Sequence, residues 1–387
     1  MSASAREILD PGRLNRALMA RQLLLRRSDL EPAGALSHLL GVHAQVPNDP
    51  YVALWSRLEG FEPEALSDML AGRQAARIAL MRSTLHLVTA DDALALRSFV
   101  QPVLDRDLYR NSTHGPAVAD LDMAALVAEG RRLLDATPLT AGELGALLQE
   151  SRPDRRPVSL AYAVRNLVPL VQVPPRGLWG ASGKPRHATA EAWLGADLDA
   201  GAAEPARVVR RYLAAFGPAT VKDVQSWCGL TRLRDVLESI REELVTFEDD
   251  RGRELLDLPD APRPDAGVPV PPRFLPEYDN VFLAHENRER IIPDGLSFAE
   301  YSRTRGFFMS ARGGILRGNL LLDGYLRGVW RASRVRRDFT LEVDVFTRLT
   351  RPQETAVAQE GERLLALVAE RADSVQVVVR EAKPSDQ

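Results

Sequence analysis

Cysteine is almost absent from this sequence, and long apolar runs are missing altogether. The single cysteine, Cys228, excludes an intramolecular disulfide and any zinc site built from several cysteines. No stretch of about eighteen consecutive apolar residues is present, so the sequence predicts no membrane partner and no membrane-spanning helix. Residues 1–7 contain no apolar core of a secretion signal, and we therefore expect a cytoplasmic protein.

The usual signatures of catalysis and cofactor binding are also missing. The sequence contains no His-Glu-x-x-His, no Gly-x-Ser-x-Gly, no Walker loop and no Rossmann glycine fingerprint. Its histidines show no paired spacing typical of metal ligands; they are His38, His43, His86, His114, His187 and His285. We therefore expect neither a metal ion nor an organic cofactor.

Lysine is rare, while acidic and basic residues nearly balance. The chain of 387 residues carries 50 Lys and Arg against 53 Asp and Glu, for a net charge of −3. Lysine occurs only at Lys184, Lys222 and Lys383, so arginine carries nearly all of the positive charge. Arginine binds phosphate with two donors at once, but a GC-rich genome also encodes arginine in excess. A nucleic-acid-binding protein of this composition needs local basic surfaces rather than a high overall charge.

The stretch at residues 37–51 contains a polar pair between apolar segments. Apolar residues before it recur at helical spacing, and Pro47 disfavours helix at the preceding residue, so we expect the helix to end near Gln45. In the extended chain beyond a helix end, residues i and i+2 point the same way, which would aim His43 and Gln45 into one cavity. The alternative is that His43 only interacts with the dipole of an ordinary helix C-terminus.

One pattern occurs twice in the chain. Residues 138–144 and 218–224 both read Pro-x-Thr-x-x-acid-apolar, which is typical of a threonine N-cap with an acidic residue three positions later. An apolar helix is expected before each segment, and a further helix and then a strand after it. This is the order of elements in a winged helix-turn-helix unit.

The two ends of the chain differ in character. Residues 9–27 predict a first helix, and residues 77–88 predict a β-hairpin with its turn at Arg82 and Ser83. After a proline-rich linker, Asp323-Gly324 predicts a tight hairpin in a strand-rich region that ends with a helix at 352–371 and a strand at 375–379. The sequence therefore predicts an α+β protein, mainly α, with winged-helix unit 1 at 1–115, unit 2 at 116–200, unit 3 at 201–262 and a C-terminal β-barrel-like domain at 263–387.

Three segments together carry a resemblance to a known family. They read Gly-Val-His-Ala-Gln-Val-Pro at 41–47, Met-Arg-Ser-Thr-Leu-His-Leu-Val-Thr-Ala-Asp-Asp at 81–92 and Leu-Pro-Glu-Tyr-Asp-Asn at 275–280. In this order and spacing they resemble the AlkZ/YcaQ family of bacterial DNA glycosylases, over nearly the whole chain. The resemblance implies three tandem winged-helix units and a C-terminal β-rich domain that together form a DNA channel.

The resemblance places the family's catalytic motif, Gln-apolar-Gln or Gln-apolar-Asp, on His43-Ala44-Gln45. Gln45 matches, whereas His43 resembles a His-apolar-Gln variant found among relatives associated with genotoxic antibiotic clusters. The implied activity is that of a monofunctional glycosylase that removes N7-alkylated purines, from simple N7-alkylguanine to bulky or crosslinked adducts, in DNA repair or antibiotic self-resistance. The implied partner is double-stranded DNA containing such purines, bound by a nucleoid-associated monomer.

These residue types suit that chemistry. N7-alkylation makes the purine cationic and a good leaving group, so no strong general acid is required. Neutral His43 can accept a proton from the attacking water, because an imidazole pKa lies at about 6.5. The amide oxygen of Gln45 can hold the same water. No lysine lies near the motif in sequence, so strand cleavage through a Schiff base is not expected.

A second set of residues is predicted to contact DNA. The set comprises Arg82, Ser83, Thr84 and His86 on the hairpin of the first unit, Asn280 in the 275–280 segment, and Arg312 and Arg317 in a glycine-rich hairpin. Each group has an alternative interpretation. The first hairpin could simply be exposed, Asp279 and Asn280 could cap a turn, and the glycine-rich hairpin could protect a sheet edge.

The same pattern is compatible with a non-catalytic winged-helix transcription regulator. Such a regulator binds one operator through one recognition helix, usually as a dimer on paired half-sites. Three different units in one chain instead favour a monomeric clamp.

Overall fold

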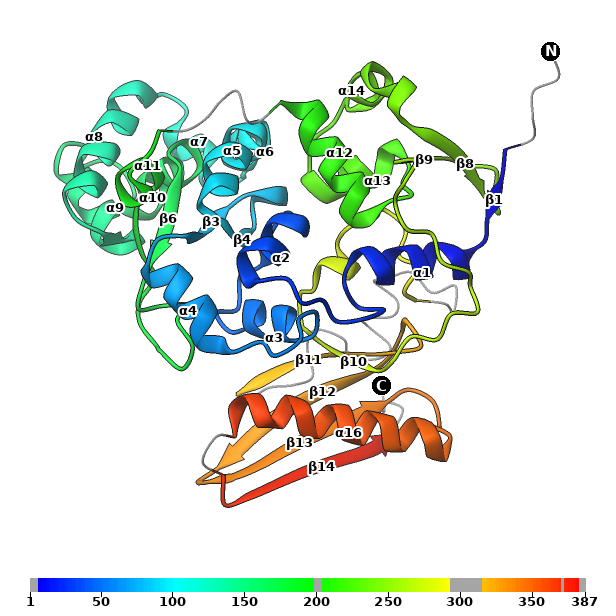
Figure 1. Ribbon diagram of the computed structural model, residues 1–387. Coiled ribbons are helices and arrows are strands. Elements are labelled where there is room, and N and C mark those ends of the chain that lie inside the picture. The colour runs from blue at the N-terminus through cyan, green and yellow to red at the C-terminus, as the bar shows by residue number, and fades with distance from the viewer. Residues whose placement is uncertain (1–5, 198–203, 293–314, 370–371, 383–387) are drawn as a thin grey trace, which may run out of the picture.

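The computed structural model describes residues 6–197, 204–292, 315–369 and 372–382, which form three β-sheets and the helices packed around them (Figure 1). The fold class is α+β, as the sequence predicts. None of the helices in these ranges has the length and apolar character needed to span a bilayer. The long C-terminal helix and its sheet form a layer at one end of the molecule (Figure 1).

The N-terminal region is mainly helical. Helix α1 (Pro11–Arg21) begins after Asp10, whose side chain accepts a hydrogen bond from the amide of Arg13 at 2.9 Å. The prediction that this helix reaches residue 27 is wrong, because Leu23 adopts a left-handed φ of 58°. The other elements of this region are β1 (Ile8–Leu9), α2 (Pro32–His38), β2 (Val42–His43), α3 (Asp49–Trp55), α4 (Pro63–Ala71), β3 (Ala75–Ala79), η1 (Met81–Ser83), β4 (Leu85–Thr89), α5 (Ala90–Phe99), α6 (Gln101–Tyr109) and α7 (Gly115–Val118).

The two segments with the repeated pattern begin with the expected caps. Thr140 and Thr220 accept from the amides of Glu143 and Asp223, whose carboxylates bind the cap amides in return, which confirms both predicted N-caps. The surrounding elements are α8 (Met123–Ala136), β5 (Leu139–Thr140), α9 (Ala141–Glu150), α10 (Pro157–Leu167), β6 (Leu170–Val173), β7 (Arg186–Thr189) and α11 (Ala190–Leu194), then α12 (Pro205–Phe216), α13 (Val221–Cys228), α14 (Arg234–Ser239), η2 (Arg241–Glu243), β8 (Val245–Asp249) and β9 (Glu254–Asp257). Their assignment as winged-helix units stays a prediction.

A six-stranded sheet joins the first two predicted units. Its order is β2-β4-β3-β6-β7-β5, and β3 pairs with β6 through Arg77 opposite Gln172 and Ile78 opposite Val171. A three-stranded sheet, β1-β8-β9, connects the N-terminal strand to the third unit. The boundary predicted at residue 115 therefore separates two hairpins that share one sheet.

The C-terminal region is a five-stranded sheet with one long helix packed on it. Its elements are β10 (Arg273–Pro276), η3 (Asn280–Phe282), β11 (Leu316–Leu322), β12 (Tyr325–Val335), β13 (Asp338–Val345), α16 (Arg351–Val368) and β14 (Ser374–Glu381). Asp323 and Gly324 adopt left-handed φ values of 50° and 79°, which confirms the predicted hairpin between β11 and β12.

This sheet is open, so the predicted barrel-like domain is wrong. Its order is β10-β11-β12-β13-β14, and in the described part of the chain the edge strands β10 and β14 do not pair with each other. Leu364 and Leu365 of α16 pack in the same apolar core as Leu341 and Val343 of β13. The sheet therefore buries its apolar face against a helix instead of closing on itself.

One apolar core connects the motif region to the C-terminal sheet. It contains Tyr51 and Leu54 of α3 together with Phe274 of β10 and Trp330 of β12. The chain that leaves β10 at residue 276 consequently runs beside the segment that contains His43.

Candidate active site

Helix α2 stops earlier than the sequence predicted. It ends at His38, and Gly41 follows with a left-handed φ of 83°. A Cβ on Gly41 would lie 2.3 Å from the side chain of Val88, so only glycine allows the chain to turn there. The prediction that Pro47 ends the helix near Gln45 is therefore wrong, since the chain leaves the helix at Leu40 and Gly41, where φ is 56° and 83°.

His43 consequently lies on a strand and not at a helix end. It is the second residue of β2 and stands opposite His86 of the antiparallel strand β4. His43 is buried with 4% of its surface exposed, whereas Gln45, just beyond the strand, is exposed. The proposed catalytic pair thus combines an imidazole from the protein interior with an amide at the surface. Their convergence on one cavity stays a prediction.

Two rings enclose the imidazole of His43. The ring centroid of His86 lies 5.3 Å from that of His43 in an edge-on arrangement, and the ring centroid of Tyr278 lies 5.2 Å away. His86 donates from Nδ1 to the carbonyl oxygen of Thr84 at 2.9 Å. His43 Nδ1, by contrast, is buried and has no hydrogen-bond partner in the described ranges. Unpaired buried polar atoms are rare in folded proteins, so this nitrogen marks a place for water or substrate.

Burial and positive charge favour the neutral form of both histidines. Burial, with a smaller contribution from the guanidinium of Arg82, lowers the pKa of His43 from 6.5 to about 4. Burial lowers the pKa of His86 well below its usual value, and charge interactions with His43 and Arg82 add to this effect. At neutral pH the ring of His43 therefore has a lone pair that can accept a proton from water.

The segment after β10 brings Tyr278 to the motif. Asn280 donates from Nδ2 to the carbonyl oxygen of Gly41 at 2.7 Å, and its contact with DNA stays a prediction. Asp279 accepts from the amide of Val281 at 3.1 Å, which confirms the turn-cap interpretation. Asp279 also forms two hydrogen bonds with the buried guanidinium of Arg57, at 2.7 and 2.8 Å. No local pattern in the sequence indicates this ion pair.

A buried carboxyl group that the sequence analysis missed completes this region. Asp49 begins α3, accepts from the backbone N–H of Tyr278, and has an Oδ2 atom without a partner in the described part of the chain. Burial, and secondly the carboxylate of Glu277, raise the pKa of Asp49 well above its usual value. Glu277 in turn accepts from Arg317 Nε at 2.7 Å. Asp49 thus retains its proton at a pH where an ordinary aspartate is ionised.

Comparison with known proteins places the chain in a family. The family model described as "DNA glycosylase AlkZ-like" matches residues 36–367. The chain belongs to the AlkZ-like DNA glycosylases. An "Interstrand DNA cross-link repair glycosylase" from Streptomyces sahachiroi is 26% identical over 337 residues, which cover 81% of this chain and 85% of the relative. The solved structure of Streptomyces sahachiroi DNA glycosylase AlkZ has a TM-score of 0.75 at 20% identity, over 96% of this chain and 100% of that chain.

The family assignment makes the protein an enzyme, a DNA glycosylase that hydrolyses N-glycosidic bonds. It confirms the resemblance carried by the three sequence segments and gives no support to a non-catalytic transcription regulator. The structural match adds that the same fold extends over nearly the whole chain.

The first hairpin of this AlkZ-like enzyme borders a basic groove. Arg82 and Ser83 adopt left-handed φ values of 56° and 60°, which confirms the predicted turn. They line a groove of about 610 Å³ together with Arg106 and Arg110. Arg106 donates to the carbonyl oxygen of Gly229 at 2.6 Å, and Arg110 is exposed. The sequence analysis missed both of these arginines because helix spacing alone does not show that α6 borders the hairpin turn.

The remaining residues predicted to contact DNA occupy other positions. His86 is buried beside His43, so its placement on an exposed hairpin surface is wrong. Thr84 donates within its own turn, to the carbonyl oxygen of Met81 at 3.0 Å. Arg317 is the partner of Glu277 described above. Arg312 lies outside the described residues.

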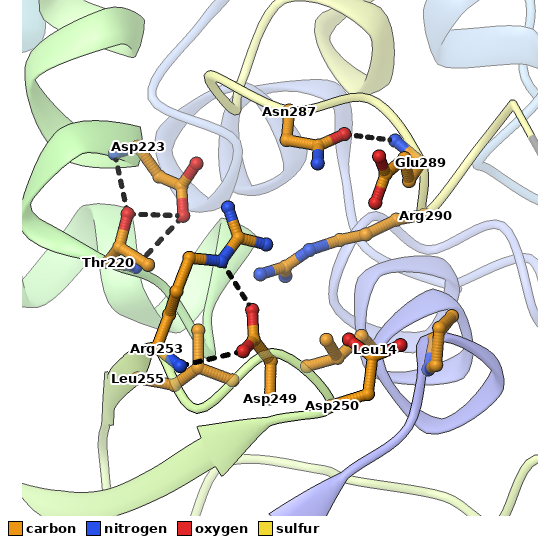
Figure 2. Close-up of a pocket in the computed structure, with 11 residues that line it drawn as sticks. Leu14, Thr220, Asp223, Asp249, Asp250, Arg253, Leu255, Asn287, Glu289 and Arg290 are labelled. Carbon is orange, nitrogen blue, oxygen red and sulfur yellow. Dashed lines mark hydrogen bonds and ion pairs between the residues drawn. The ribbon is translucent and has the colours of Figure 1, made fainter. Parts of the chain in front are cut away.

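A second polar pocket is structural. Thr220, Asp223, Asp249, Arg253 and Arg290 are among the residues that line it, and the guanidinium of Arg290 points into it (Figure 2). Its volume is about 30 Å³, enough for about two water molecules and too small for a nucleobase. None of the motif residues lines this pocket. Nor do the described residues contain a group of 3 or more His, Cys, Asp or Glu that could hold a metal ion.

Proposed function

We propose that this enzyme hydrolyses the N-glycosidic bond of N7-alkylated purines in double-stranded DNA, including bulky and crosslinked adducts of genotoxins. The observation that carries the proposal is the buried neutral imidazole of His43, whose Nδ1 has no protein partner in the described ranges. The curated relative is named for repair of interstrand cross-links, which supports the crosslinked class of substrate. DNA repair and antibiotic self-resistance are both consistent with this activity, and the monomeric state and nucleoid association stay predictions.

The proposed reaction needs little acid catalysis. The purine alkylated at N7 is cationic, and it leaves as a neutral base when the C1′–N9 bond breaks and its electron pair stays on N9. Water forms the new bond to C1′, and His43 takes the proton that this water loses. Gln45 holds the water through its amide oxygen, so that the attack occurs from a fixed position. The products are the free base and an abasic site.

Release of the modified base from defined duplexes tests this proposal. Wild-type protein is expected to release the base from a duplex containing N7-methylguanine and from one carrying an N7-linked interstrand crosslink, as measured by mass spectrometry. Gln45→Ala is expected to slow release about 100-fold, because the water loses its alignment. Its affinity for the same duplex should stay within a few fold, since the proposed role of Gln45 is to hold water and its exposed side chain supports no core packing.

Two outcomes would contradict these assignments. If wild-type protein releases neither modified base, N7-alkylated purines are not its substrates. If the affinity of Gln45→Ala falls as much as its rate, Gln45 is a DNA-binding residue rather than a residue that positions water.

We further propose that the groove at Arg82, Arg106 and Arg110 binds DNA phosphates. Arg110→Gln is expected to weaken binding to an undamaged duplex and to reduce the slope of log affinity against log salt by about 1, because one fewer phosphate is neutralised. Arg380→Gln is the control: β14 and α6 lie at opposite ends of the molecule (Figure 1), so the slope should not change. Equal slopes in wild-type protein and Arg110→Gln would count against the groove.

A further inference from the structure

A buried arginine holds the backbone of the catalytic motif. Arg77 lies on β3 with 1% of its surface exposed, and it donates from Nη2 to the carbonyl oxygen of Ala44 at 2.6 Å. In the sheet Arg77 stands opposite Leu87, which in turn stands opposite Val42, so Arg77 shares a row with Val42 and not with His43. Because neighbouring positions on a strand face opposite sides, Arg77 reaches the motif from the face away from the imidazole.

Besides the ladder between β2 and β4, hydrogen bonds hold the motif segment at different places. Asn280 binds the carbonyl oxygen of Gly41 at 2.7 Å, and the amide of Ala44 donates to the carbonyl oxygen of Leu85 at 2.8 Å. Both bonds act before the peptide that joins Ala44 to Gln45, whereas Arg77 binds the carbonyl of that peptide itself. The strand ends at His43, so this bond orients the chain where it leaves the sheet.

The guanidinium of Arg77 is held in place at considerable energetic cost. A Cβ on Gly177, which has a φ of 97°, would lie 2.8 Å from both Cδ and Nη1 of Arg77, so the glycine backbone packs directly against the side chain. Tyr51 anchors this glycine by donating to its carbonyl oxygen at 2.7 Å. Nε and Nη1 of Arg77 have no partner in the described residues. A buried charge with unpaired donors destabilises a fold, so a role in the site explains its presence better than stability does.

We propose that Arg77 is a positioning residue of the glycosylase, which orients the Ala44–Gln45 peptide so that Gln45 and His43 hold the same water. The expected effect of Arg77 on the rate of base release rests on the proposed function, whereas its contact with Ala44 does not. Arg77 touches neither water nor substrate in this role and acts only through the motif backbone.

The first test compares two equally buried arginines. Arg77→Met is expected to lower the single-turnover rate on an N7-methylguanine duplex about 100-fold, with DNA affinity within a few fold of wild type. Arg97→Met is the matched control, because Arg97 is also 1% exposed and donates to a backbone carbonyl, that of Asn166 at 2.9 Å, away from the motif. Its rate should stay within a few fold at a temperature where both variants are folded. Arg77→Lys, whose ammonium can still donate to a carbonyl oxygen, should recover part of the rate.

The second test needs no activity. Ala-Gln occurs twice in the sequence, at 44–45 and 358–359, so labelling alanine carbonyls with ¹³C and glutamine amides with ¹⁵N should give two correlated NMR signals. Gln45→Ala removes one of them and thereby assigns it. The Ala44 carbonyl signal is expected to move in Arg77→Met and not in Arg97→Met, while the signal of Ala358 in α16 stays in place.

The two readouts together separate the possible failures. An unmoved Ala44 signal overturns the contact, and a moved signal with an unchanged rate overturns the positioning role. If Arg77→Met does not fold, Arg77→Gln, which is shorter and uncharged, is judged by the same two criteria. If the Ala44 signal moves in Arg77→Met but wild-type protein releases no base, the contact stands and the proposed function is contradicted.

Discussion

His43→Ala is expected to lower the rate of base release at neutral pH by about 10²- to 10⁴-fold, the range typical for loss of a general base. Burial keeps the ring of His43 neutral, and its Nδ1 has no protein partner in the described ranges, so the alanine variant loses the group that accepts the water's proton. Single-turnover release of N7-methylguanine measures the effect. Affinity for the same duplex is the control, and a rate within a few fold of wild type would show that His43 is only part of the wall of the site.

The pH dependence of the reaction provides a sharper test of the same residue. Because the pKa of His43 is lowered to about 4, the ring stays neutral in mildly acidic solution and becomes protonated only below that value. Excision is therefore expected to fall as the pH drops through about 4, and not near the ordinary imidazole value of about 6.5. His43→Gln restores the better-known motif without a titrating group, so it should keep some activity on N7-methylguanine and lose this acidic decline.

The comparison requires a pH range in which both proteins stay folded, with spontaneous depurination subtracted. An unchanged acidic decline in His43→Gln would assign the titration to another group. His43 would then orient the water or form the pocket wall.

Arg57→Met is expected to destabilise the fold by about 3–5 kcal/mol, the usual cost of removing one partner of a buried ion pair. Arg57 and Asp279 are almost fully buried and are joined by bonds of 2.7 and 2.8 Å, so the variant leaves the carboxylate of Asp279 without its partner. Asp279 lies between Tyr278 and Asn280, which contact the motif region, so local loosening of the site should accompany the loss. Chemical denaturation measures the free energy of unfolding.

Two controls define this result. Arg57→Met combined with Asp279→Asn removes both charges and should recover part of the lost stability. Arg155→Met breaks an ion pair with Asp120 that lies at the surface, and it should change stability little. If Arg57→Met is no less stable than Arg155→Met, the buried pair does not hold the segment around Tyr278.

Several features could be predicted from the sequence because they depend on residues close together in the chain. The caps at Thr140 and Thr220 join groups three residues apart, and the hairpin at Asp323-Gly324 follows from backbone angles that those two residues adopt easily. The three segments of the family pattern likewise indicate the family, which the family model confirms over residues 36–367.

The sequence by itself thus determined the two N-caps, the hairpin turns, the motif and the family. The tertiary structure decided the surroundings of the motif: Tyr278 against the ring of His43, Arg77 on the carbonyl of Ala44, and Asp279 with Arg57. These partners lie far apart in the chain, and no periodicity links them, because packing of the sheets and of the core shared with α3 brings them together. Burial is the physical reason that these surroundings matter. Desolvation, which only the folded chain provides, keeps the imidazole of His43 neutral down to a pH of about 4.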